Sequence, residues 1–167
     1  MKKDAIDNAW RIHDAQLHWT AKADAKAAFA FGVDSAAIAA VVALFSTGKV
    51  FHHFDHWWLT VLFVLGAACL VVGSVFSAVG VAPRLRAKLA QSESGSNYIY
   101  FGHARHWDAA EIEESLRADD LLPQLSRNIV QAANISWKKH VAVTWSIWFT
   151  MASGVVLAIY LVLSRFD

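Results

Sequence analysis

The sequence predicts an all-α integral membrane protein with three transmembrane helices. Apolar residues make up 56% of the 167 residues and charged residues only 17%, whereas a typical globular domain has about 45–50% and about 25%. A soluble chain of this size needs more polar surface than such a composition supplies. Two prolines, eight glycines and one cysteine disfavour a hairpin-rich β fold and exclude an intramolecular disulfide framework.

The surplus of apolar residues is concentrated in three runs, which are the expected transmembrane spans. Residues 27–45 carry one charge, Asp34, whereas residues 58–81 and 141–163 carry none. Because a bilayer core of about 30 Å needs roughly 20 apolar helical residues, the second and third runs are long enough to cross it. The first run is alanine-rich and weaker. Small residues on the second run permit close helix contact: Gly66, Ala67, Gly73, Ser74 and Gly80.

The lysines and arginines predict the orientation. Thirteen of the fifteen lie in residues 1–26 or 82–140, and two lie in residues 46–57 or the C-terminal tail. Because cytoplasmic loops are enriched in these residues, we expect the N-terminus and the long loop in the cytoplasm and the C-terminus outside. If the first run did not span, the positive charge would be divided between the two sides, so the asymmetry supports the weakest span.

The polar segments are expected to be helical extensions of the spans. Residues 4–26 contain neither proline nor glycine, so one helix is expected from about residue 5 to 45. A second long helix is expected over residues 121–163, and a short one over 108–117. Together the extensions and the short helix would form a small helical cytoplasmic module within a single membrane unit. Two apolar stripes mark the extensions: Ile6, Trp10, His13, Leu17 and Ala21, and Leu122, Leu125, Ile129, Ala132 and Ser136.

Four local signatures follow one another in a fixed order. The segment ADAKA at residues 23–27 precedes the first span, PRLR at 83–86 follows the second, and YFGH at 100–103 lies in the long loop. A long amphipathic helix then enters the third span. In this order and placement the chain resembles the Pycsar effector family, bacterial membrane proteins of an antiphage signalling system, over residues 10–163.

The resemblance implies an effector that senses a cyclic pyrimidine mononucleotide, cUMP or cCMP, made by a partner cyclase after phage infection. Such an effector then impairs the inner membrane and stops growth of the infected cell. Catalysis, metals and other cofactors are not expected, since no nucleophile motif or phosphate-binding glycine loop is apparent. The net charge of +1 predicts no nucleic-acid polymer as partner. Three helices cannot enclose a wide pore, so we expect a homo-oligomer in the lipid bilayer.

A receptor for such a nucleotide needs cations for the phosphate and aromatic or amide groups for the base. The polar segments offer candidates of all three kinds: Arg84, Arg86, Arg105 and Arg127; Tyr100, Phe101 and His103; Gln131 and Asn134. Structural roles without a ligand could also explain these candidates. Arg84 and Arg86 could contact anionic lipid headgroups, residues 100–103 could be a packed turn, and Arg127 could lie on a solvated helix face.

Three further candidates lie at or within the first span. Asp24 and Lys26 could pair with charges on neighbouring helices. Asp34 lies about 10 Å past Ala27 on a straight helix. Inserting an aspartate into a transmembrane helix costs roughly 2.5–3.5 kcal/mol on insertion scales, and Asp34 is a functional candidate for that reason. We expect it in the membrane-perturbing element, and the plainer reading is a protonated or water-bridged acid near a helix defect.

Two other functions remain open from the residues alone. The chain could be a ligand-independent ion or proton conductor with Asp34 as its titrating group, in which case flux would follow pH and ignore nucleotides. It could also be a non-conducting membrane scaffold that recruits a soluble partner through the aromatic loop, in which case that partner would co-purify with it.

Overall fold

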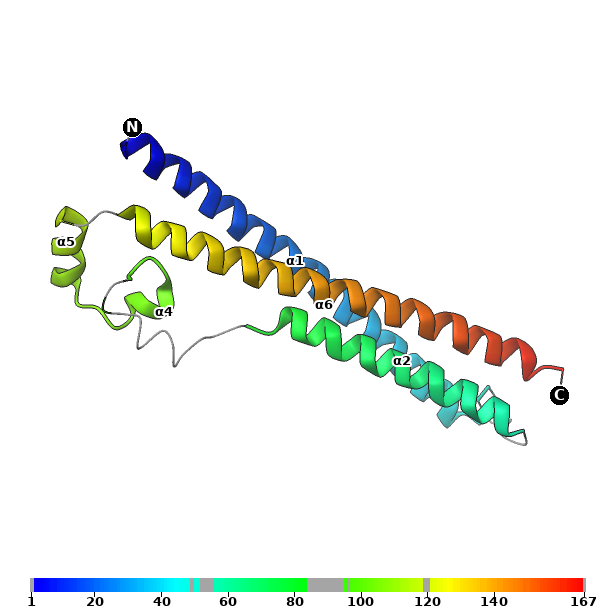
Figure 1. Ribbon diagram of the computed structural model, residues 1–167. Coiled ribbons are helices and arrows are strands. Elements are labelled where there is room, and N and C mark those ends of the chain that lie inside the picture. Colours follow the sequence, from blue (N-terminus) through cyan, green and yellow to red (C-terminus); the bar gives the residue numbers. More distant parts are fainter. Residues whose placement is uncertain are drawn as a thin grey trace. The chain divides into compact units, whose positions relative to one another are not determined.

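The computed structural model describes residues 2–48, 50–51, 56–83, 95, 97–118 and 121–166. Within these residues the chain contains helices and no strand, which confirms the predicted all-α class (Figure 1). Three of the helices are long and apolar enough to cross a membrane. The helices are α1 (Lys2–Ser46), α2 (Trp57–Val81), α4 (Phe101–Ala104), α5 (Ala109–Ala118) and α6 (Leu121–Leu163).

The helices divide between two compact units. The polar unit comprises Met1–Lys22 and Pro83–Trp137, and the apolar unit comprises Ala23–Ala82 and Lys138–Asp167. Both α1 and α6 contribute to each unit, since neither helix is interrupted at the boundary. The first polar segment and the first span therefore form one helix, as the absence of proline and glycine predicted.

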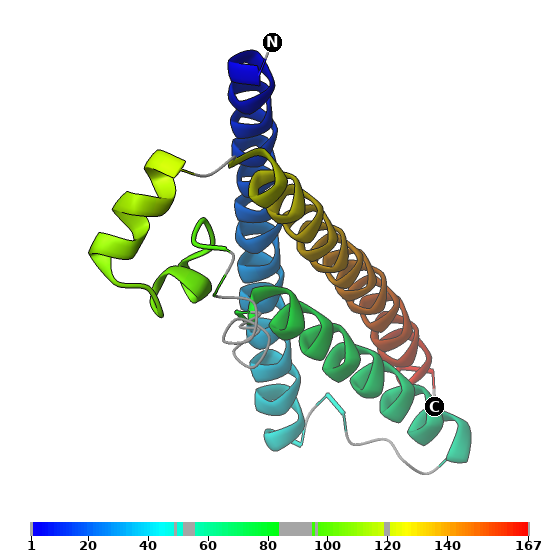
Figure 2. The ribbon, with the colours of Figure 1, turned by 60° about the vertical axis from the view of Figure 1, so that its left-hand side comes forward.

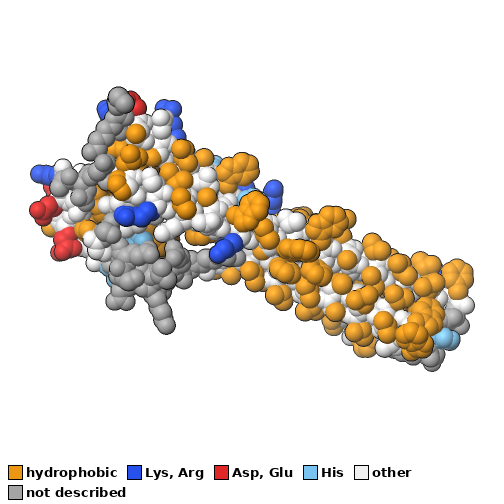
Figure 3. Space-filling model, viewed as in Figure 1, with side chains coloured by type: hydrophobic (Ala, Val, Ile, Leu, Met, Phe, Trp, Pro, Cys, Tyr) orange, Lys and Arg blue, Asp and Glu red, His pale blue; other side chains and the backbone are white. Residues whose placement is uncertain are grey.

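The apolar unit is built from the second half of α1, from α2 and from the second half of α6, which lie side by side (Figures 1 and 2). Hydrophobic side chains cover the face of this unit shown in Figure 3. Phe29 is 77% exposed and Met151 is 58% exposed. Because water would disfavour so much exposed apolar area, lipid is the solvent that suits these helices.

Glycines on α2 allow the helices of the apolar unit to approach closely. Gly66, Gly73 and Gly80 are all buried. A Cβ atom added at Gly73 would lie 2.8 Å from Thr150 Oγ1, and one added at Gly80 would lie 2.9 Å from Ala27 Cβ. These contacts confirm the close packing predicted for the second span, on one side against α6 and on the other against α1.

We expect Gly73→Ala to destabilise the apolar unit by about 1–3 kcal/mol, because the added methyl group overlaps Thr150. Gly154→Ala on α6 is the matched control, since a Cβ there meets nothing within 4 Å. That control should change stability by no more than about 1 kcal/mol. Unfolding of the purified chain in mixed detergent–SDS micelles measures both variants, and equal stabilities would contradict the close contact.

Aromatic packing and a proline define the two ends of α2. Near its start, Leu59 is buried with Phe51, Leu157 and Tyr160, and the rings of Phe51 and Tyr160 lie 5.5 Å apart. At its end, Ala82 has an extended ψ of 131°. A residue before proline disfavours the helical region because the proline ring crowds its backbone, so Pro83 ends the helix within a residue of the predicted boundary.

A local hydrogen bond supports the start of α5, and burial distinguishes the two predicted apolar stripes of the polar unit. Glu111 Oε2 accepts a hydrogen bond of 3.2 Å from Asp108 N, which satisfies a backbone donor at the start of α5. On α6, Leu125 is fully buried and Ser136 is 6% exposed, as the second stripe predicted. The first stripe does not pack as one face, because Leu17 on α1 is 51% exposed.

Candidate functional site

A buried carboxylate joins the three long helices of the apolar unit. Asp34 on α1 is 1% exposed. Its Oδ1 accepts a hydrogen bond of 2.5 Å from Thr150 Oγ1 on α6. Its Oδ2 accepts hydrogen bonds from Ser77 Oγ on α2, at 2.9 Å, and from Ser146 Oγ on α6, at 3.3 Å. We call these four residues the Asp34 cluster.

Helical spacing and small side chains assemble the Asp34 cluster. Ser146 and Thr150 are four residues apart, so they lie on one face of α6. Gly73 and Ser77 are also four apart on α2, and Gly73 lets Thr150 approach. On α1, Ala23 and Ala27 are fully buried on the face that continues to Asp34. Small residues therefore bring three backbones close enough for short side chains to reach one carboxylate.

Three hydroxyl groups donate to the side chain of Asp34. The spans offer no counter-charge, since residues 58–81 and 141–163 carry no charged side chain. Each hydroxyl has one proton and, in two cases, a second acceptor: Ser77 Oγ lies 2.9 Å from Ser74 O, and Thr150 Oγ1 lies 2.9 Å from Ser146 O. These two hydroxyls can therefore donate either to Asp34 or to their own helices.

The helix around Asp34 is regular. Residues 32–35 are helical, and the hydroxyl of Ser35 donates to Phe31 O at 2.7 Å, away from the carboxylate. The reading of Asp34 as an acid beside a helix defect is therefore wrong. The hydrogen-bond partners of Asp34 lie on neighbouring helices. Its sequence neighbour Ser35 does not contribute one.

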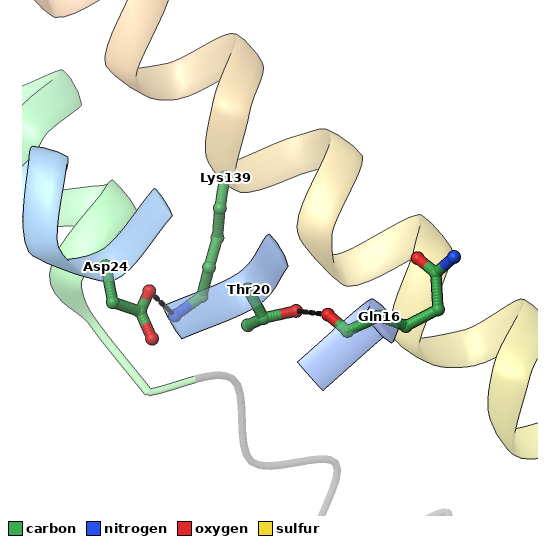
Figure 4. A network of polar contacts seen from close by, with 4 residues as sticks. All are labelled: Gln16, Thr20, Asp24 and Lys139. Carbon is green, nitrogen blue, oxygen red and sulfur yellow. Dashed lines mark hydrogen bonds and ion pairs between the residues drawn. The ribbon is translucent and has the colours of Figure 1, made fainter. Parts of the chain in front are cut away.

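An ion pair forms a second connection between α1 and α6. The ammonium of Lys139 contacts Asp24 Oδ1, as Figure 4 shows. The Lys139 side chain is 6% exposed and that of Asp24 is 43% exposed. The predicted pairing of Asp24 with a neighbouring helix is thus present. Lys26 makes no ion pair within the described part of the chain, so its predicted pairing is absent there.

Buried amides that the sequence analysis did not select organise the polar unit. Tyr98 N donates to Gln124 Oε1 at 3.4 Å, and Asn128 Nδ2 donates to Asn97 Oδ1 at 3.4 Å. The side chains of Asn97, Gln124 and Asn128 are buried. Gln124 and Asn128 lie four residues apart on α6, which is the one sequence signal that could have indicated a shared polar face.

The aromatic loop candidates lie together at the start of α4. His103 is 2% exposed and meets the Tyr100 ring edge-on at 5.2 Å, whereas Phe101 is 66% exposed. A Cβ atom at Gly102 would lie 2.3 Å from Tyr100 Cε1, so glycine leaves room for the tyrosine ring. Residues 100–103 therefore pack as a tight turn and leave one aromatic side chain exposed.

The charged and amide candidates within the described residues of the polar unit are exposed or half-buried. Arg105 is exposed, and its Nε donates to His106 Nε2 at 3.1 Å. Arg127 and Asn134 are exposed on α6, and Gln131 is half-buried between them. Arg84 and Arg86 lie outside the described residues.

The fold and the site define a helical membrane protein with three spans, two of which continue into a polar helical unit. The family model for the Pycsar effector protein domain matches residues 8–164. The chain therefore belongs to the Pycsar effector family, as its resemblance predicted, and the match supports a role as an antiphage effector. Comparisons with curated proteins and with solved structures find no match to this chain.

Proposed function

We propose that this protein is an antiphage effector that binds a cyclic pyrimidine mononucleotide through its polar unit and impairs the inner membrane through its apolar unit. The family match carries this proposal, because it extends over both units, from residue 8 to residue 164. The charge asymmetry supports a cytoplasmic polar unit, since thirteen of fifteen lysines and arginines lie on its side of the spans. A cytoplasmic cyclase would release its product on that side.

The polar unit has the chemistry that such a ligand needs. Arg105 and Arg127 are exposed cations that suit a cyclic phosphate, and Arg84 and Arg86 add to them in sequence. Phe101 offers an exposed aromatic face on which a base can stack. Amide side chains that suit the pyrimidine edge are Gln131 and Asn134 on α6.

The apolar unit would respond to the ligand through α1 and α6, each of which runs through both units without a break. A ligand shifts a conformational equilibrium only by binding one state more tightly than the other. The Asp34 cluster suits a two-state element, because two of its hydroxyls have alternative acceptors. Several copies would be needed to open the membrane, which makes homo-oligomerisation part of the proposal.

Thermal stabilisation of the detergent-solubilised chain tests ligand binding. At a hundredfold excess over Kd a ligand adds about 2.7 kcal/mol, which should raise Tm by roughly 5–10 °C for a chain of this size. We expect this shift with cCMP or cUMP and not with cAMP or cGMP.

Arg127→Ala should remove most of the shift. Arg117→Ala is the matched control, because Arg117 is exposed and pairs with Glu113 on the same helix, and it should leave the shift intact. A flat response to all four nucleotides would contradict the proposed function.

A further inference from the structure

A groove of about 490 Å³ lies between α1 and α6 in the apolar unit. Phe29 and Val33 line it from α1, and Ile147 and Met151 line it from α6. Ala30 lies between the two α1 residues in sequence and also lines the groove, so its small side chain helps to leave the space open. The lining is thus apolar over most of its length.

Among the described residues, Lys26 is the charged group of the groove that has no ion-pair partner. It lines the groove and is exposed, and it has no ion pair within the described residues. The two nearby acids are already satisfied: Asp24 pairs with Lys139, and Asp34 accepts three hydroxyl hydrogen bonds. The described residues therefore offer Lys26 no counter-ion, and its ammonium is accessible to an anionic group from outside.

The dimensions of the groove match one leaflet of a bilayer. Lys26 directly precedes the first apolar run, so it lies where the hydrocarbon region begins. From Lys26 to Asp34, both of which line the groove, the helix rises about 12 Å. Half of a hydrocarbon core of about 30 Å is roughly 15 Å. The groove therefore starts at the headgroup level and continues through most of one leaflet.

We propose that this groove binds one anionic phospholipid, with its phosphate against Lys26 and an acyl chain along Phe29, Val33 and Met151. A lysine at this depth extends its aliphatic stem past apolar surface and places its ammonium among the headgroups. A span from a second copy fits less well, since its acids at this depth are already engaged: Asp24 pairs with Lys139, and Asp34 is buried among three hydroxyl donors. Such a helix would leave Lys26 without a counter-ion.

Native mass spectrometry of the full chain, released from micelles that contain equal amounts of phosphatidylglycerol and phosphatidylcholine, tests the proposal. We expect the chain to retain phosphatidylglycerol preferentially. Lys26→Gln should lower that preference about fivefold, the effect of one lysine near an anionic surface. Lys138→Gln is the matched control, because Lys138 is exposed at the same boundary and does not line the groove.

A second pair of variants tests the space itself. Ala30→Leu fills the groove and should lower retention of both lipids several-fold, whereas Ala28→Leu adds the same volume at an exposed position outside it. Circular dichroism checks that all variants remain helical. Equal lipid preference in Lys26→Gln and the unaltered chain would overturn the proposal, and so would an Ala30→Leu variant that changes oligomeric state while its lipid retention is unchanged. The assay needs no nucleotide, so its outcome is independent of the proposed function.

Discussion

If the proposed function holds, replacing Asp34 with leucine is expected to abolish the growth arrest that follows cyclase activity, raising the surviving cell count at least tenfold. Leucine accepts no hydrogen bond, so Ser77, Ser146 and Thr150 lose their common acceptor. Hydrogen bonds between membrane helices average about 0.6 kcal/mol, and three of them amount to about 2 kcal/mol. A difference of that size changes a conformational equilibrium constant by more than tenfold.

The expected loss concerns function and leaves insertion intact. Leucine inserts more favourably than aspartate, because the charged residue costs roughly 2.5–3.5 kcal/mol at the centre of a span. Ser77 and Thr150 can turn to the carbonyl oxygens of Ser74 and Ser146, so the variant keeps two of its three hydroxyls bonded. The variant has only one hydrogen-bonded arrangement, however, whereas the native cluster can adopt two. The proposed two-state element needs both.

Asp34→Asn and Ser35→Ala serve as comparisons. Asparagine keeps the shape and one acceptor oxygen, so its effect should lie between those of the native residue and leucine. Ser35 bonds within α1, and its loss should change nothing. Viable counts, entry of a membrane-impermeant dye and the amount of membrane-inserted protein are measured together. Undiminished toxicity of Asp34→Leu with unchanged assembly would contradict a role in the membrane-perturbing element.

The helices of this protein could be predicted closely because their causes are local. The third long helix was expected over residues 121–163 and is observed over Leu121–Leu163, and the second differs by one residue at its start. Apolar run length, the absence of breakers and Pro83 are properties of neighbouring residues. The thickness of a bilayer then converts run length into spans, so no tertiary contact has to be known.

The site could be predicted only in part because its contacts depend on helix rotation. The sequence indicated that Asp34 and Asp24 needed partners, and it did not identify them. Asp24 and Lys139 are separated by 115 residues, and Asp34 and Thr150 by 116. These near-equal separations show that α1 and α6 are in step. Their parallel direction follows from the predicted topology, but a single sequence does not reveal which residues of the two helices face each other. The pair between Asn97 and Asn128 is hidden because Asn97 lies outside the helices, so no helical period predicts which residue of α6 it meets.

The ion pair between Asp24 and Lys139 should respond unequally to loss of its two partners. Asp24→Asn leaves an ammonium whose side chain is 6% exposed without its counter-charge, and breaking a buried pair in this way costs about 3 kcal/mol. Lys139→Met leaves a carboxylate that is 43% exposed. Water can solvate that group, so the cost should fall to about 1 kcal/mol.

The double variant separates this explanation from simple loss of a contact. Asp24→Asn combined with Lys139→Met leaves no buried charge, so it should be more stable than Asp24→Asn alone although it lacks both partners. Lys138→Met, which alters an exposed neighbour, should change stability by less than about 0.5 kcal/mol. SDS-induced unfolding measures all four variants. Equal and additive costs for the two single variants would mean that the buried ammonium does not need Asp24. The ion pair would then be a weak surface contact, and the Asp34 cluster would be the contact that holds α1 and α6 together.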